Sequence, residues 1–244
     1  MMRGLFVTGA GTDVGKTTVA AGLLRMLRAQ GLDAVPMKPV QTGARRDEDG
    51  TLNAPDLDVS LAAAGLSPDA AERARMSPCL FEPACSPHLA ARLYGRLIDA
   101  GTIFAAAQWL SARHDALVVE GAGGVLVPIG EGRTMADLMV CLAMPVVLVS
   151  PGGLGAINHA LLSIEAIRSR GLRLLGVVMT ETHRVPEVSR YIHEDNVRTI
   201  AEAGKTKILA RIPYLGTSPD WAAIDTALGG CQDILEYEEE TNSP

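Results

Sequence analysis

The sequence predicts an α/β protein with a mostly parallel central sheet and helices on both faces of that sheet. Short apolar runs alternate along the chain with longer segments of helical period, which is typical of β-α-β units. The chain has 244 residues, of which 48% are hydrophobic and 20% are charged, so that one domain can bury a substantial core. We therefore expect a single domain over residues 1–244, with a disordered acidic tail from about residue 236.

The expected elements follow in chain order. The run GLFVTGA predicts a first strand, and KTTVAAGLLRMLRAQG predicts an amphipathic helix that ends at Gly31. Further strands are predicted at DAVPMKPV, ALVVEGA, PVVLVS, LLGVVMT and KILARIP, and further helices near residues 103–114, 155–171 and 186–204. Two regions interrupt this alternation: residues 41–58 predict a mobile polar loop that leads into a helix, and the proline-rich residues 76–91 predict irregular structure.

Composition excludes several classes of function. A formal net charge of -6 argues against a nucleic-acid partner, because affinity for a phosphate backbone comes from clustered Lys and Arg. The longest apolar stretch, residues 135–149, contains Asp137 and Pro145, so no membrane span is expected. The N-terminus has neither the apolar region nor the cleavage site of a signal peptide, and we expect a cytoplasmic protein. The 4 cysteines and 5 histidines show no metal-binding spacing, which favours free thiols.

A glycine-rich turn joins the first predicted strand to the first predicted helix. In VTGAGTDVGKTT the spacing is one residue longer than the usual G-x-x-x-x-G-K-[ST], since position 10 is Ala and glycines stand at Gly9 and Gly11. Backbone N–H groups in such a turn converge on an anion, and the helix dipole adds partial positive charge there. We therefore predict a P-loop NTPase-like fold, in which Lys16 reaches the β- and γ-phosphates and Thr17 ligates Mg²⁺.

Charged residues follow two other predicted strands. Glu120 comes directly after four apolar residues, and burying an unpaired carboxylate is costly, which favours a Mg²⁺ partner over a helix-capping surface acid. Lys38 is either a solvated lysine or a group that neutralises charge on a transferring phosphoryl group. Asp56 and Asp58 either help to hold the metal or place charge in the first turn of a helix.

Two classes of P-loop protein lack support in the sequence. We find no N-K-x-D motif of a Ras-type GTPase, and no lysine stands early in the loop, as it does in the partitioning ATPases. A small-molecule enzyme is the leading class that remains.

Six motifs together resemble one enzyme family, dethiobiotin synthetase. They are VTGAGTDVGKTT with its lengthened loop, MKPVQTG, FEPACSPHLAA, LVVEGAGG, GLGAINHALL and IPYLG, in the order and spacing of that family. The resemblance covers nearly the whole chain and fades after about Gly216. It implies an ATP- and Mg²⁺-dependent ligase of biotin synthesis, a homodimer that converts 7,8-diaminononanoate and CO₂ into a cyclic urea through a carbamate and a carbamic-phosphoric anhydride.

The resemblance also implies roles for residues. Phosphoryl transfer is assigned to Lys38, Lys16, Thr12 and Asp13, and the metal to Thr17, Asp56 and Glu120. The nucleotide is assigned to Asp13, Val14, Gly15, Lys16, Thr17, Thr18, Asp56, Glu120, Gly121, Ala122, Gly123, Thr180, Glu181, Pro213, Tyr214 and Leu215.

Other residues are implied for the substrate. Thr42 would hydrogen-bond the carbamate. The substrate carboxylate would be received from the partner subunit, at a helix start whose free N–H groups suit an anion. The candidates there are Gly153, Leu154, Asn158 and Tyr191, and without the resemblance Tyr191 would be interpreted as an exposed helix residue.

The sequence departs from the family at one place. After GVVM, where family members often have Asn-Asp to recognise adenine, this chain has Thr180 and Glu181. A hydroxyl cannot make the bidentate contact of an amide, so we expect looser discrimination among nucleoside triphosphates, CTP for instance.

Two rival interpretations stay open. Cobyrinate amidotransferases share this kind of domain but add a glutaminase domain, for which 244 residues leave no room. The second rival interpretation is a nucleotide-switched regulator that binds a protein partner. Under this interpretation, nucleotide hydrolysis would not depend on a diamine or bicarbonate.

Overall fold

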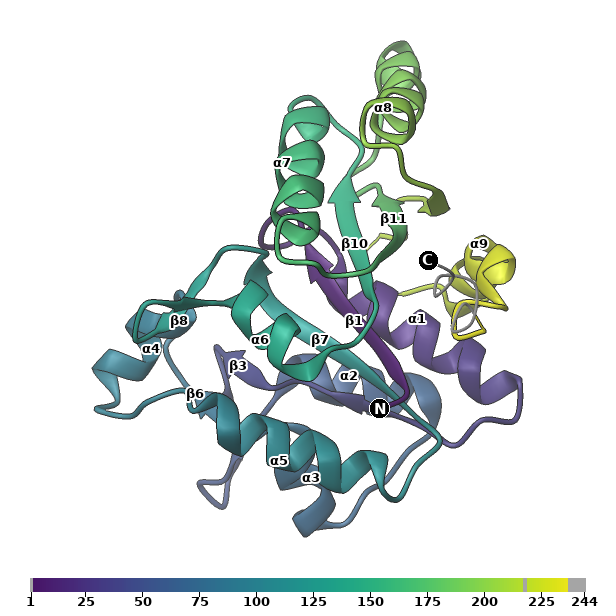
Figure 1. Cartoon of the computed structure of the whole chain (residues 1–244). Coiled ribbons are helices and arrows are strands. Elements are labelled where there is room, and N and C mark those ends of the chain that lie inside the picture. The colour runs from purple at the N-terminus through teal and green to yellow at the C-terminus, as the bar shows by residue number, and fades with distance from the viewer. Residues whose placement is uncertain (1, 217–218, 237–244) are drawn as a thin grey trace, which may run out of the picture.

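The computed structural model describes residues 2–216 and 219–236, and the predicted disordered tail lies almost entirely outside them. Its centre is a six-stranded sheet in the order β12-β11-β10-β1-β7-β2, with every neighbouring pair parallel (Figure 1). The strands are β1 (Gly4–Gly9), β2 (Ala34–Met37), β7 (Ala116–Gly124), β10 (Val146–Pro151), β11 (Leu174–Thr180) and β12 (Ile208–Ile212). Each of the six predicted strands is therefore confirmed.

Helices cover both faces of the sheet. They are α1 (Lys16–Ala29), α2 (Pro55–Ala64), α3 (Ala70–Met76), α4 (Pro87–Leu93), α5 (Ala100–Ser111), α6 (Met135–Leu142), α7 (Ala156–Arg168), α8 (Arg190–Ala203) and α9 (Trp221–Leu228). Short 3₁₀ turns, η1 (Glu187–Ser189) and η2 (Gly229–Cys231), precede α8 and follow α9. The predicted α/β fold with helices on both faces is confirmed.

The core lies in two layers, one on each face of the sheet. Leu5 and Val7 of β1 pack with α1 and α9, whereas Phe6 between them packs with the helices α5, α6 and α7 on the other face. All six residues of β1 are buried, as expected of a central parallel strand that is covered on both sides. Residues at or just after the carboxyl ends of β1, β7 and β2 line one cavity, at the end of the sheet where ligands usually bind in such folds.

Two irregular regions differ from expectation. Residues 76–91 contain β6 (Cys79–Phe81), which pairs in parallel with β3 (Val40–Thr42), and the helix α4. The prediction of irregular structure was therefore wrong there, because Pro87 stands at the start of α4, where its missing N–H would have no helical partner. Residues 41–58 form a small antiparallel hairpin, β4 (Arg45–Arg46) with β5 (Leu52–Asn53), before the predicted helix α2.

Some helix boundaries follow from caps that the apolar pattern does not show. Helix α5 begins earlier than predicted because the Asp99 side chain accepts hydrogen bonds from the backbone of Gly101 and Thr102. Helix α6 was not predicted. It begins with a capping box between Thr134 and Asp137. Directly before it lies β9 (Arg133–Thr134), which forms a hairpin with β8 (Pro128–Gly130). Within the described residues, no helix has the length and apolar character that a membrane crossing requires.

Candidate functional site

The predicted P-loop connects β1 to α1 as a compact turn. Gly9 must be glycine, because a Cβ there would lie 2.8 Å from the carbonyl oxygen of Gly11. Gly15 precedes α1 with φ of 89°, a left-handed conformation that favours glycine. Lys16 is the first residue of α1, and its Nζ donates to the carbonyl oxygen of Gly11 across 2.8 Å. Burial, followed by the nearby charge of Lys38, lowers the pKa of Lys16.

An ion cluster with a buried centre lies beside this turn, and Asp56 at its edge is 34% exposed. Lys38 Nζ is 2.6 Å from Asp56 Oδ2 and 2.7 Å from Glu120 Oε1, and the Thr17 hydroxyl donates to the same Glu120 oxygen across 2.8 Å. Lys38 and Glu120 are each only 4% exposed. Burial opposes the charge on Lys38, but the two carboxylates outweigh it and raise the pKa of Lys38 above its usual value.

Strand register explains why these residues meet. Met37 of β2 pairs with Val119 of β7, so the next residue on each strand, Lys38 and Glu120, comes level at the carboxyl end of the sheet. Asp56 lies in the first turn of α2, which places its carboxylate at the same end. Residues that the sequence analysis considered one by one therefore lie together, because parallel strands end at a common edge of the sheet.

A cavity of about 810 Å³ joins the P-loop to the ion cluster. Eleven of the predicted site residues line it: Thr12, Asp13, Gly15, Lys16, Thr17, Lys38, Thr42, Asp56, Glu120, Ala122 and Gly123. Sequence reasoning assigned no role to several other lining residues: Gln41, Gly43, Arg45, Cys85, Ser86 and Pro87. Three of these lie in FEPACSPHLAA, whose recurrence in the family is the signal that would have pointed to them.

The donor set in this cavity suits a hard divalent cation. Asp56 and Glu120 supply carboxylate oxygens and Thr17 a hydroxyl, which are the oxygen ligands that Mg²⁺ prefers. Asp58 does not join them, because its carboxylate pairs with Arg73. The suggestion that Asp58 helps to hold a metal is therefore not supported by the structure.

Thr180 lies beneath the P-loop and is 5% exposed. Its hydroxyl donates to the carbonyl oxygen of Val14 across 2.8 Å, so it already has a partner within the protein. A second cavity, of about 420 Å³, contains Thr180, Glu181 and Pro213 among its lining residues. Tyr214 and Leu215 also belong to the described chain, but they do not line this cavity. Leu215 packs against the part of the core that contains the buried residues of α1.

The candidates for the substrate carboxylate lie elsewhere. Gly153, Leu154, Asn158 and Tyr191 line neither of these two cavities, although all belong to the described chain. Leu154 is 96% exposed and Tyr191 is 68% exposed. These four residues are therefore not part of the P-loop cavity.

A buried amide that the sequence analysis missed holds the loop before α7. Asn196 of α8 donates to the carbonyl oxygens of Gly152 and Gly153, at 2.8 and 2.9 Å. His193, also buried, lies against Gly152, where an added Cβ would come within 2.6 Å of its Nδ1. Helix α8 thus fixes the shape of the loop that carries Gly153 and Leu154.

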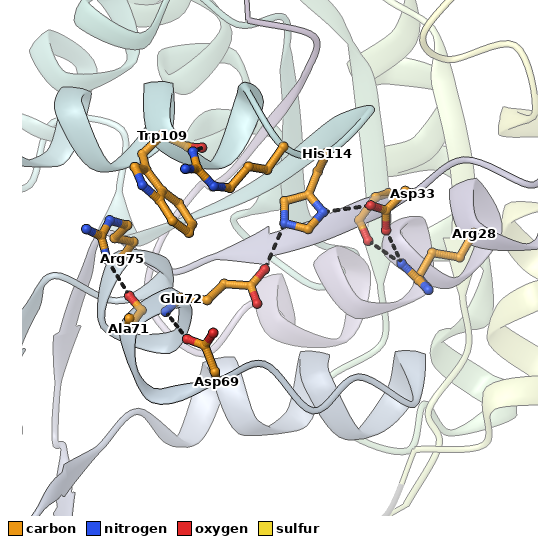
Figure 2. A network of polar contacts seen from close by, with 10 residues as sticks. Arg28, Asp33, Asp69, Ala71, Glu72, Arg75, Trp109 and His114 are labelled. Atoms are coloured by element: carbon orange, nitrogen blue, oxygen red, sulfur yellow. Dashed lines mark hydrogen bonds and ion pairs between the residues drawn. The ribbon is translucent and has the colours of Figure 1, made fainter.

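A separate polar network links α3, α5 and the start of β2 (Figure 2). The two ring nitrogens of His114 lie 2.7 Å from Asp33 Oδ2 and 2.7 Å from Glu72 Oε1. Nearby, the guanidinium groups of Arg75 and Arg113 contact the Trp109 ring, at 4.3 and 3.7 Å from its centroid. These residues do not line the P-loop cavity, and the contacts are those of a network that stabilises the fold.

Comparisons with known proteins agree on one family. A family model described as an AAA domain matches residues 3–219. The ATP-dependent dethiobiotin synthetase of Anaeromyxobacter dehalogenans is 41% identical, over 93% of this chain and 96% of the relative. The enzyme of the same name from Pseudomonas paraeruginosa is 42% identical, over 88% of this chain and 91% of the relative.

Solved structures support the fold alone. A chain of the MinC:MinD cell division protein complex of Aquifex aeolicus aligns with a TM-score of 0.62 at 15% identity, covering 99% of this chain and 98% of that one. The signal recognition particle receptor FtsY of Elizabethkingia anophelis aligns with a TM-score of 0.53 at 13% identity, covering 95% of this chain and 64% of that one. Such low identity shows a shared P-loop architecture and carries no conclusion on function.

Proposed function

This chain belongs to the ATP-dependent dethiobiotin synthetase family, and we propose that it closes the urea ring of dethiobiotin from 7,8-diaminononanoate and CO₂. One amine of the substrate forms a carbamate with CO₂. A carbamate oxygen then attacks the γ-phosphorus of ATP and displaces ADP, which gives a carbamic-phosphoric anhydride. The second amine attacks the carbonyl carbon of this anhydride, closes the ring and releases phosphate.

The observation that carries the proposal is the position of two lysines on one cavity. Lys16 and Lys38 both line the 810 Å³ space, and both are buried. Phosphoryl transfer depends mainly on positioning and on neutralising charge, so two ammonium groups at one wall supply what the transferring phosphoryl group requires. Thr42 lines the same cavity, where its hydroxyl would hydrogen-bond the carbamate.

Mg²⁺ would be held by Thr17, Asp56 and Glu120. When bound, it would neutralise phosphate charge during the transfer. Two further polar residues of the wall, Thr12 and Asp13, lie on the P-loop, where backbone N–H groups would hold the phosphates. The base would extend toward the cavity that Thr180, Glu181 and Pro213 line.

A homodimer would complete the site. Leu154 and Tyr191 are exposed on the α7–α8 side, where they would receive the carboxylate of the substrate that is bound in the partner subunit's cavity. Within the described residues, no side chain caps the start of α7 after Gly155, and the N–H groups of its first turn would suit an anion.

The experiment that tests the proposal is phosphate release from Mg·ATP, with and without 7,8-diaminononanoate plus bicarbonate. Release should require both co-substrates and should collapse in Lys16→Ala and Lys38→Ala. Lys205→Ala is the matched control, because Lys205 lies outside both cavities. Release that is indifferent to the diamine would reject the ligase and favour the nucleotide-switched regulator.

A further inference from the structure

The ammonium group of Lys38 lies where a metal ion would contact its ligands. It is within 2.6 Å of Asp56 and 2.7 Å of Glu120, the two carboxylates of the proposed Mg²⁺ site. The Glu120 oxygen that accepts from Lys38 also accepts from the Thr17 hydroxyl, the third proposed metal ligand. Two of the three proposed metal ligands thus contact the lysine nitrogen directly, and the third, Thr17, contacts the same Glu120 oxygen.

Two carboxylates this close require a cation. Glu120 is 4% exposed, and a buried carboxylate without a counter-charge is strongly destabilising. Lys38 is equally buried and donates in addition to the carbonyl oxygen of Gly121 at 3.3 Å. The described structure offers one other ammonium group in this cavity, Lys16, and it donates to the carbonyl oxygen of Gly11.

We infer that Lys38 is the internal counter-ion of the metal site in the nucleotide-free protein, and that Lys38 and the metal ion bind Asp56 and Glu120 alternately. A metal ion and an ammonium group cannot contact the same carboxylate oxygens at one point, so each excludes the other. The inference deepens the proposed function, on which it rests for the identity of the metal.

A consequence concerns the order of binding. A metal ion that displaces Lys38 leaves a buried ammonium group without its anions, which is unfavourable unless another anion is present. The phosphates of a nucleotide would supply that anion in the same cavity. Metal alone should therefore bind weakly, and metal with nucleotide should bind tightly.

The test measures Mn²⁺ binding to the nucleotide-free protein by electron paramagnetic resonance, since the free ion and the bound ion give different signals. Lys38→Gln and Lys38→Met remove the charge and should bind Mn²⁺ about tenfold or more tightly than the wild type. Lys38→Met/Glu120→Gln should lose this gain. Lys16→Met is the matched control, because it removes a lysine charge from the same cavity without contacting either carboxylate.

Thermal unfolding supplies a second readout. In EDTA, Lys38→Met should unfold at a lower temperature than the wild type, because Asp56 and Glu120 then lack a counter-charge. Mn²⁺ should recover much of this loss in the variant and should hardly change the melting temperature of the wild type. For the wild type, addition of ADP should tighten Mn²⁺ binding.

Two results would overturn the inference. One is Mn²⁺ binding to the nucleotide-free wild type as tight as to both Lys38 variants. The other is an equal gain in Lys16→Met, which would mean that only general charge in the cavity matters. Neither measurement uses the diamine, so failure of the ligase assay with these results intact would reject the proposed function alone.

Discussion

Thr180 at the end of β11 donates its hydroxyl hydrogen to the carbonyl oxygen of Val14 and so fastens the sheet to the P-loop across 2.8 Å. Its side chain also packs under the turn, since a Cβ added to Gly15 would lie 3.3 Å from the Thr180 methyl carbon. The residue that replaces the family's asparagine therefore supports the backbone that would bind phosphate. Its hydroxyl proton is not free to recognise a base.

Thr180→Val should weaken nucleotide binding while the protein stays folded. The substitution keeps the shape and removes a neutral hydrogen bond worth about 1 kcal/mol, so the KM for ATP should rise about threefold to tenfold. Steady-state kinetics would measure this, and Thr180→Ser, which keeps the donor, is the control. An unchanged KM in Thr180→Val would show that this bond does not shape the loop.

Base discrimination should be loose. Because the Thr180 hydroxyl is engaged with Val14, it cannot replace the amide contacts to adenine. We expect CTP and other nucleoside triphosphates to support ring closure within about tenfold of ATP, since one polar contact is worth about 1 kcal/mol. A panel of kcat/KM values would check this, and a strict requirement for ATP would contradict it.

Lys16→Met should increase the stability of the folded protein and reduce its activity. Burial lowers the pKa of Lys16 in the folded protein, so the folded state binds that proton less tightly than the unfolded chain does. The charged lysine therefore costs stability at pH values below its folded pKa, and this cost shrinks as the pH rises through that pKa. The ligand-free variant should be more stable than the wild type at pH 7, and the difference should narrow toward alkaline pH.

The same substitution should also reduce ring closure by about 100-fold or more, because a preorganised charge in the transition state is removed. Chemical denaturation at several pH values and steady-state kinetics would measure the two effects. A variant that is less stable than the wild type at pH 7 would contradict the role of burial.

His114 should stabilise the fold through its two carboxylates. The hydrogen bond from His114 is the main cause that lowers the pKa of Asp33 below its ordinary 3.8. Such a lowered carboxyl pKa contributes stability at pH values above the unfolded pKa and loses it as the pH falls through the folded pKa. His114→Ala should therefore lower the free energy of unfolding at pH 5 to 6 by about 1 kcal/mol, a modest value because Asp33 is half exposed.

Urea denaturation from pH 6 to pH 2 would follow this difference, which should disappear at the acid end. Diamine-dependent phosphate release should hardly change in His114→Ala, because the network does not line the P-loop cavity. A stability difference that persists at pH 2 would contradict the contribution of Asp33.

Two inactive variants should complement each other if the site spans a dimer. Lys38→Ala removes a group of the subunit's own cavity, whereas Tyr191→Ala removes an exposed group that would serve the partner's site. After denaturation and refolding together, about a quarter of the wild-type activity should return, because half of the dimers are mixed and each has one intact site. Activity no higher than that of the separate variants would reject the shared site.

The sequence by itself determined the order and type of the central elements. All six strands were visible as short apolar runs, because strands buried on both faces need continuous apolar residues. The P-loop was equally visible, since Gly9, Gly15 and Lys16 are neighbours whose conformations are set within one turn. Helix α4 was missed because proline at a helix start and proline in a loop look alike without the surrounding backbone.

Only the tertiary structure decided which of these residues act together. Lys38 and Asp56 were each ambiguous in the sequence, between a solvated charge and a functional one, and the structure shows that Lys38 is buried and contacts both Asp56 and Glu120. Thr180 and Val14 are 166 positions apart, and no local pattern links them. The physical reason is that secondary structure follows from periodicity within a few residues, whereas a site depends on strand register and packing between distant segments.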